Sequence, residues 1–427
     1  MSRKPTWRII ARLVPVLSAV YILSQFLRSS NGVIGPDLIR DIGLGPEGLG
    51  LLTGLFFVTF ALAQIPVGVL IDNIGPRLTM AAFLAFAIAG SVFFARSETM
   101  VGLATGRALM GAGCSALLVG ALIVYARWFP PDRFATMTSF AMGIGYSGIV
   151  LATAPLAWVA SSLGWRHVFL GLAAIAGLLL LAVLVLVRDA PRAHPFHARG
   201  SEPLAVTARG LFDVLRNRKL RQIAPMLFIS YGSMFSILGL WAGPYLHDVH
   251  GLGIRERGEI MLVMAVSAVV GLFCYGPLDR LFNTRKWLVV FGASCNAGVF
   301  LLLAIIPGIA LWQITLAFAL LAGLNGYVAV LIAHGRSIYP DRLVGRGMTV
   351  NNMINMGGVA VLQILTGFLI GIFPSTDGVA PESAYRLVFA ALGGMLALAL
   401  PFYIGSEDAA PRTEGRSKIL TRAKASD

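Results

Sequence analysis

GVLIDNIGPR, the ten residues from Gly68 to Arg77, joins two long apolar stretches of the sequence. Glycine lets neighbouring helices approach closely and lets the chain turn sharply, which favours Gly68 and Gly75 at these positions. Asp72 and Arg77 place opposite charges in the short polar connection between the apolar stretches. The segment therefore predicts a tight turn between two apolar helices, with a charge pair at the turn.

The chain on either side of this turn consists mainly of apolar runs. Of its 427 residues, 57% are hydrophobic and 13% are charged, whereas soluble domains carry roughly 25% charged residues. A run of about 20 apolar residues spans a bilayer as a helix, because each backbone group is then bonded within its own segment. We therefore predict an all-α membrane protein with twelve transmembrane helices. These lie at about 11–36, 47–72, 77–96, 100–128, 133–160, 165–187, 221–246, 256–279, 286–306, 310–336, 343–373 and 383–404.

Lysine and arginine gather in alternate connections between these runs. The segments 188–220 and 405–427 together hold nine arginines and three lysines, while the opposite connections hold few, such as Arg40, Arg96 and Arg166. Cytoplasmic loops carry this excess, so both termini are predicted to be cytoplasmic, in an inner membrane of bacterial type. The net charge of +14 then reports topology and contact with the lipid bilayer, not a nucleic-acid partner.

The long polar segment in the middle divides the chain into two similar halves. We predict a six-helix bundle at 1–187, a cytoplasmic linker at 188–220, a second bundle at 221–404 and a cytoplasmic tail at 405–427. Several motifs recur 208 positions later: Gly35-Pro36 as Gly243-Pro244, Gly43-Leu44-Gly45 as Gly251-Leu252-Gly253, Gly68 as Gly276, and Arg77 as Arg285. Further echoes are Pro131-Asp132-Arg133 with Pro340-Asp341-Arg342, and Trp165-Arg166 with Tyr385-Arg386. This pattern indicates a parallel duplication about an axis along the membrane normal.

With this duplication in place, the segment from Gly68 to Arg77 resembles the signature between helices two and three of the major facilitator superfamily. The resemblance covers nearly the whole chain and implies two pseudo-symmetric bundles that alternate access to a central site. It also implies a gating role for Gly68, Gly75, Asp72 and Arg77, which would latch the cytoplasmic side in one state. Asn73 stands where the family usually has a basic residue, so the latch is expected to be weaker. An ordinary solvated charge pair is the alternative.

Arg107 lies in the segment GRALMGAG, residues 106–113, which resembles the helix-four arginine motif of the same superfamily. The resemblance implies a gating role for Arg107. The alternative is an arginine near a helix end whose side chain extends along the helix to reach water.

Arg28 is the most informative single residue, because it lies well inside the first apolar run, eight positions before Pro36. An arginine at membrane depth is costly and is by default functional. Tyr21, Ser24, Gln25 and Arg28 recur at helical spacing, so they share one face of the helix, which we expect to line the central cavity.

The position of Arg28 resembles the helix-one arginine that binds substrate in organophosphate:phosphate antiporters and organic anion:cation symporters of this superfamily. A guanidinium suits a carboxylate or a phosphate through paired hydrogen bonds. The duplicated position holds Ser236, not a second arginine, which favours a carboxylate over a phosphate ester. A structural role for Arg28, as a partner of backbone carbonyls, remains the alternative.

Other polar residues within the predicted spans are weaker candidates for substrate contact. They are Tyr146, Tyr231, Ser233, Asn325, Asn352 and Asn355. Hydrogen bonding between helices would explain any one of them equally well.

No catalytic, cofactor or metal motif emerges from the sequence. The glycine pattern from Gly143 to Gly148 lies within an apolar helix with no preceding strand, so it does not predict dinucleotide binding. Walker, HExxH and GxSxG motifs are absent, and the cysteines all lie inside apolar runs without ligand spacing. We therefore expect no enzyme, no cofactor and no metal.

The combined prediction is a secondary transporter, acting as a monomer, that moves a small organic anion by alternating access with Arg28 binding the anion. Proton coupling through Asp37 or His334, exchange of two anions and facilitated diffusion all remain open, since no carboxylate lies at predicted mid-membrane depth. The alternatives are a proton-coupled drug or metabolite efflux antiporter, and a receptor or channel without alternating access. The segment 154–157 lacks the Gly-Pro pattern typical of such antiporters.

Overall fold

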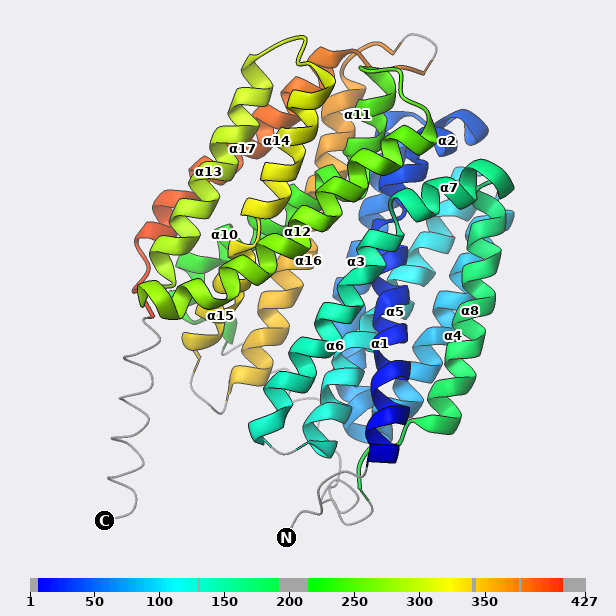
Figure 1. The fold of residues 1–427 in the computed structure, drawn as a ribbon, viewed down its shortest axis with the longest axis vertical. Helices are drawn as coiled ribbons and strands as arrows, with labels where there is room; N and C mark the ends of the chain where they lie inside the picture. The colour runs from blue at the N-terminus through cyan, green and yellow to red at the C-terminus, as the bar shows by residue number, and fades with distance from the viewer. Residues whose placement is uncertain (1–6, 130, 192–213, 340–342, 376–377, 410–427) are drawn as a thin grey trace.

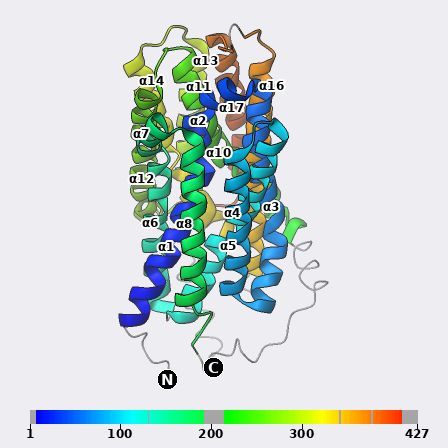
Figure 2. The same cartoon turned by 90° about the vertical axis from the view of Figure 1, so that its right-hand side faces the viewer.

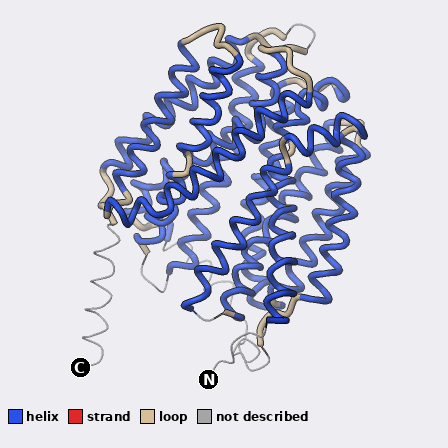
Figure 3. Tube along the Cα trace, in the orientation of Figure 1, coloured by secondary structure: helices blue, strands red, loops and turns tan. Residues whose placement is uncertain are grey.

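The computed structural model describes residues 7–129, 131–191, 214–339, 343–375 and 378–409, and these fold into helices joined by short loops (Figures 1 and 3). The helices of the first half are α1 (Trp7–Ser29), α2 (Asn31–Ile42), α3 (Pro46–Ile74), α4 (Pro76–Arg96), α5 (Met100–Trp128), α6 (Pro131–Leu151), α7 (Ala154–Leu163) and α8 (Trp165–Leu186). Those of the second half are α10 (Arg218–Ser236), the π-helix η2 (Ile237–Trp241), α11 (Ala242–Asp248), α12 (Ile254–Phe282), α13 (Lys286–Ile305), α14 (Leu311–Leu324), α15 (Tyr327–Ser337), α16 (Val344–Gly371) and α17 (Glu382–Ile404).

Among the described residues, ten helices are long and apolar enough to cross a membrane, or up to twelve if each of two bent pairs counts as one span. The bent pairs are α1 with α2, at 46°, and α6 with α7, at 42°. Most predicted spans agree with the helices to within a few residues. Three spans predicted as continuous helices are interrupted. The span at 11–36 breaks at Ser30 and continues to Ile42. The span at 133–160 breaks between α6 and α7, and the span at 310–336 breaks between α14 and α15.

The break at Ser30 has a local cause in the segment Ser29-Ser30-Asn31-Gly32. Serine and asparagine compete for backbone hydrogen bonds and glycine is a poor helix former. The Ser30 hydroxyl donates to the Leu27 carbonyl at 3.2 Å. The predicted pattern of apolar residues therefore gave the right span but not the bend within it.

Figure 1 shows α1–α8 as one group of helices and α10–α17 as a second group facing it, and Figure 2 gives the same arrangement from the side. The two groups pack directly where α3 meets α16, α7 meets α12, and α2 meets α11. The middle of the predicted linker, residues 192–213, lies outside the described residues, as do the repeat segment 340–342 and the tail from 410 onward.

The duplicated glycines adopt the same backbone conformation in both halves. Gly43 has φ of 70° and Gly251 has φ of 68°, the left-handed conformation that glycine adopts most easily. Gly45 and Gly253 then begin α3 and α12 with matching extended dihedrals. The sequence repeat is thus also a repeat of local structure.

The repeated aromatic residues Trp165 and Tyr385 make equivalent hydrogen bonds in the two halves. The Trp165 indole donates to Asp41 at 2.9 Å, and the Tyr385 hydroxyl donates to Asp248 at 2.6 Å. Each bond ties the last helix of a half to the first.

The two ends of the interface between the helix groups differ. At the end formed by α2 and α11, a Cβ on Gly243 would lie 1.9 Å from the Gly32 carbonyl, and one on Gly258 would lie 2.4 Å from Ala157. Toward the other end, where α1 begins, Gly276 of α12 borders a cavity, and a Cβ on Gly276 would meet no atom within 4 Å, as would one on Gly68 of α3. We call these the closed end and the open end.

Candidate substrate site

A cavity of about 570 Å³ lies between the two groups of helices. Its wall is mainly apolar and includes Met142, Ile149, Met234, Phe235, Leu272 and Ile332. Of the predicted substrate residues, only Tyr146, Tyr231 and Asn325 line it. The cavity is thus an apolar space with a few polar groups at its wall.

Arg28 does not itself line this cavity, but it contacts Tyr231, which does. Its Nη1 donates to the Tyr231 hydroxyl at 3.3 Å, and its guanidinium carbon lies 4.8 Å from the centre of the Phe60 ring. The side chain is 6% exposed, and its Nε has no hydrogen-bond partner. Within the described part of the chain, no carboxylate lies at ion-pair distance from it. Arg28 is therefore a buried cation without a protein counter-ion.

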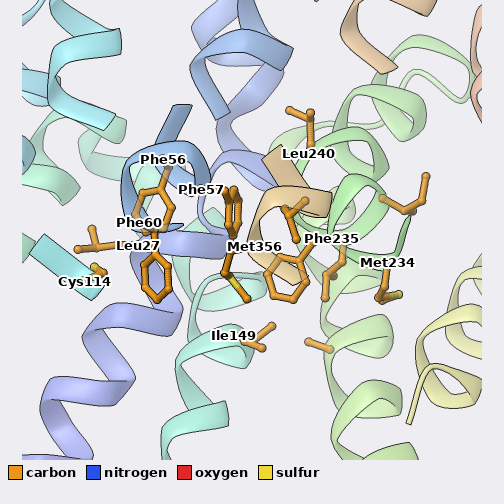
Figure 4. Close-up of a cluster of buried hydrophobic side chains, with 14 of the residues drawn as sticks. Leu27, Phe56, Phe57, Phe60, Cys114, Ile149, Met234, Phe235, Leu240 and Met356 are labelled. Carbon is orange, nitrogen blue, oxygen red and sulfur yellow. The ribbon is translucent and has the colours of Figure 1, made fainter. Parts of the chain in front are cut away.

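Figure 4 shows a cluster of buried apolar side chains that includes Phe57, Phe60 and Phe235, and two of these rings contact Arg28. Phe57 and Phe60 of α3 face the guanidinium on one side, at 6.0 and 4.8 Å to the ring centres. The Phe57 ring also packs edge-on against Phe235 of α10 at 6.0 Å. Sequence reasoning missed these aromatic residues, because an aromatic run in an apolar helix looks like ordinary core. Their rings lower the cost of burying the cation through cation–π contact.

The rest of the predicted polar stripe packs inside the first half instead of lining the cavity. Tyr21 meets the Tyr146 ring edge-on at 6.5 Å. Gln25 is fully buried against α6 near Gly148, with neither amide atom hydrogen-bonded, and Ser24 is 1% exposed. Tyr21, Ser24 and Gln25 therefore lie outside the cavity wall.

Of the candidate residues in the second half, some line the cavity and others do not. Ser233 donates to the Ser230 carbonyl at 3.2 Å within its own helix. Asn325 lies at the break between α14 and α15 and belongs to the cavity wall, while its Oδ1 is buried without a hydrogen-bond partner. Asn355 is 5% exposed with an unpartnered Oδ1, and Asn352 is half-buried; neither lines the cavity.

Arg107 holds α5 against the break that follows α1. Its Nη1 donates to the Leu27 carbonyl at 2.9 Å, and its guanidinium lies over Phe56 and Phe94 at 5.2 and 5.7 Å. The residue is fully buried, so it does not extend along the helix to water. Its position supports a role in shaping the α1–α2 bend beside Arg28.

The turn at Gly68–Arg77 is tied to its own half of the molecule. Gly75 adopts φ of 88°, which confirms the sharp turn. The Arg77 backbone N–H donates to Asp189 at 2.7 Å, and the Arg77 guanidinium donates to the Leu184 carbonyl. The sequence analysis did not predict this role for Asp189. Asp408 makes the equivalent contact in the second half, where it accepts from the Arg285 N–H at 3.0 Å.

A third buried arginine, Arg257, was not predicted from the sequence. It lies at the closed end, 2% exposed, with its Nη2 3.4 Å from Asp37 of the other half. Arg40 approaches the other oxygen of Asp37 at 3.2 Å. Asp37 therefore joins the two halves by an ion pair. The sequence offered little signal for this, because Arg257 is one of several charges near the start of α12.

His334 has partners for both ring nitrogens. Its Nδ1 lies 2.6 Å from the Tyr403 hydroxyl, and its Nε2 lies 2.9 Å from the Glu407 carbonyl. This arrangement favours a structural role over proton transfer.

Comparison with known proteins places the chain in a class. A family model of the Major Facilitator Superfamily matches residues 17–334, and the chain belongs to that superfamily of membrane transporters. A putative tartrate transporter of Agrobacterium vitis is 24% identical over 309 residues, which is 66% of this chain and 67% of that protein.

A probable galactarate/D-glucarate transporter, GudP of Escherichia coli (strain K12), is 23% identical over 312 residues, 66% of this chain and 67% of that protein. Among solved structures, a bacterial homologue of the human lysosomal transporter Spinster, inward-facing and unoccupied, is similar with a TM-score of 0.77. That likeness has 18% identity and covers 93% of this chain and 97% of the other, so it concerns the fold.

Proposed function

We propose that this chain is a secondary transporter of a small organic carboxylate, and that Arg28 binds the carboxylate. The observation that carries the proposal is the buried Arg28 guanidinium, which has no carboxylate beside it among the residues that the structure describes. A buried charge without a partner is costly, and a bound anion would supply the missing charge and accept from the free Nε. Relatives named as transporters of tartrate and of galactarate or glucarate support a carboxylate as cargo.

The two ends of the interface supply the elements that alternating access requires. The closed end combines close glycine packing with the Asp37–Arg257 ion pair, while the open end leaves space beside Gly68 and Gly276. If the termini are cytoplasmic, as the distribution of arginine and lysine predicts, the cavity opens to the cytoplasm. The turn at Gly68–Arg77 would then close that end when the halves rock.

Efflux of a lipophilic compound by proton antiport is the second candidate, favoured by the apolar wall of the cavity. It leaves the charge of Arg28 unexplained, because a lipophilic cation would be repelled by a guanidinium.

Thermal unfolding of the purified protein with a panel of carboxylates, neutral sugars and lipophilic cations distinguishes the candidates. A ligand at a hundredfold excess over its dissociation constant stabilises the folded state by about 2.7 kcal/mol. We expect a carboxylate to raise the Tm of the wild type and of Arg221→Ala, an exposed arginine control, but not of Arg28→Ala. Equal stabilisation of wild type and Arg28→Ala by lipophilic cations would reject anion transport in favour of efflux.

A further inference from the structure

We infer that the cargo is a monocarboxylate with an apolar body, and not a polyhydroxylated diacid of the kind that the relatives' names describe. This inference rests on the proposed function, since it takes Arg28 as the carboxylate ligand. It concerns what the remainder of the substrate must be.

The number of cations at the site sets the number of carboxylates. Arg28 is the cation beside the cavity, and no lysine, histidine or further arginine is found in the cavity wall described by the structure. A second carboxylate on the same small molecule would face side chains such as Met234 and Phe235. An ionised group in apolar surroundings loses its hydration without compensation, so a diacid is disfavoured.

The hydrogen-bonding groups of the wall limit the hydroxyl groups that a substrate can carry. The polar side chains at the wall are those of Tyr146, Tyr231 and Asn325, and the Tyr231 hydroxyl already accepts from Arg28. A sugar diacid has a hydroxyl on every internal carbon, and each one left without a partner is penalised. The Asn325 amide is the remaining polar side chain of the wall, so the site suits at most a single hydroxyl or amine on an otherwise apolar body.

The shape of the site places the two ends of such a molecule. Tyr231 both contacts Arg28 and contributes to the cavity wall, so the carboxylate belongs at this corner. The remaining wall, formed by α12 and α15, presents Ala268, Leu272 and Ile332. These side chains suit an aliphatic chain or an aromatic ring, because the transfer of apolar surface out of water lowers the free energy of the complex.

The test is a binding series on the full-length purified protein, measured by thermal unfolding and calorimetry. The probes are acetate, hexanoate, benzoate, tartrate and glucarate. Each buried methylene strengthens binding by about fourfold, so hexanoate and benzoate should bind wild type roughly tenfold or more tightly than acetate. Tartrate and glucarate should bind more weakly than either, and Arg28→Ala should lose all binding.

A matched pair of variants locates the apolar body. Leu272→Ser places a hydroxyl in the cavity wall, whereas Leu281→Ser makes the same change on an exposed part of α12. We expect Leu272→Ser to weaken the binding of benzoate by roughly tenfold and to leave the binding of acetate unchanged. Leu281→Ser should leave the affinity for both compounds unchanged.

The outcomes separate the inference from the proposed function. Tighter binding of tartrate or glucarate than of hexanoate and benzoate, lost in Arg28→Ala, would overturn the inference and keep carboxylate transport. Unchanged benzoate binding in Leu272→Ser would also overturn it. If no carboxylate distinguishes wild type from Arg28→Ala, the proposed function fails and takes the inference with it.

Discussion

The two halves of the molecule share a scaffold in close detail and differ where the charge lies. Gly43 and Gly251 turn the chain in the same way, and Asp189 and Asp408 cap corresponding helices. At the centre the equivalence ends, because the position that holds Arg28 in the first half holds a serine in the second. Repeated residues therefore identify the framework, and the departures from the repeat identify the candidate site.

The first helix of each half is irregular at the same point of the repeat, but in different ways. In the first half, α1 breaks at Ser30, two residues after Arg28. In the second, α10 passes into the π-helix Ile237–Trp241, and the Trp241 indole donates to Thr366 at 2.8 Å. Such π segments are frequent at functional sites. The π-helix contributes Leu238 to the cavity wall, and the break at Ser30 follows Arg28.

The largest expected effect on transport comes from removing the charge of Arg28 in the first half. Arg28→Ala should reduce carboxylate uptake into proteoliposomes by roughly a hundredfold, since a charge-assisted, paired contact is lost. Arg28→Lys should retain only part of the activity, because an ammonium cannot form the same paired contact.

The symmetric position provides the control. Ser236 is fully buried and donates to the Gly232 carbonyl within its own helix at 2.8 Å. Adding Ser236→Arg to Arg28→Ala should not restore uptake. Recovery of uptake would show that the halves are interchangeable at the centre and would break the comparison.

The next effect concerns glycines repeated in the two halves. Gly258 packs against Ala154 and Ala157 across the interface, so Gly258→Ala forces apart backbone that cannot yield. We expect this variant to lose about 1–3 kcal/mol of stability by overpacking, measured as a lower Tm. Gly276→Ala, on the same helix where a Cβ meets nothing within 4 Å, should change the Tm little. Equal losses would contradict the assignment of closed and open ends.

A smaller effect is expected from the ion pair between the halves. Asp37→Asn removes the charge that faces buried Arg257 and should shift the ratio of closed to open conformations at this end by roughly tenfold. The measurement is the distance between two spin labels, attached to cysteines that replace exposed Glu98 and Pro307 in an otherwise cysteine-free protein. Pulsed electron paramagnetic resonance gives the distribution of this distance, and so the share of each conformation.

Asp41→Asn is the matched control for this measurement. Asp41 lies four residues further along and pairs with Arg40 and Arg166 inside the first half. Its substitution should leave the distance distribution unchanged. If Asp37→Asn behaves like Asp41→Asn, the ion pair does not hold the halves together.

Much of the scaffold could be predicted from the sequence, because apolar runs and repeated turn residues act locally. The span at 100–128, for example, coincides with α5. The site was harder, because it depends on which sides of helices face one another. Arg28 could be identified from its depth in an apolar run, but the role of Phe60 depends on packing between helices, and those of Phe57 and Arg257 on packing between halves. Gln25 shares a helix face with Arg28, yet the neighbouring α6 covers it.

The smallest effect tests the repeated caps. Burial alone would raise the pKa of Asp408, but hydrogen bonds from Thr284 and from the N–H groups of Arg285 and Lys286 outweigh it and lower that pKa. A carboxyl whose pKa is lower in the folded state stabilises the fold above its unfolded pKa and loses that contribution as pH falls through the folded value. Asp408→Asn should therefore lower stability by about 1 kcal/mol near pH 7, and the difference from wild type should narrow toward pH 3.

Glu407→Gln is the control for this pH series, because the neighbouring Glu407 is exposed and pairs only at the surface with Lys219. Surface ion pairs contribute little, so its Tm should follow the wild type throughout. If the difference in free energy of unfolding between Asp408→Asn and wild type stays constant with pH, the cap acts through the shape of the side chain and not through its charge. The same outcome in Asp189→Asn would extend that conclusion to both halves, since Asp189 caps α4 at the corresponding turn.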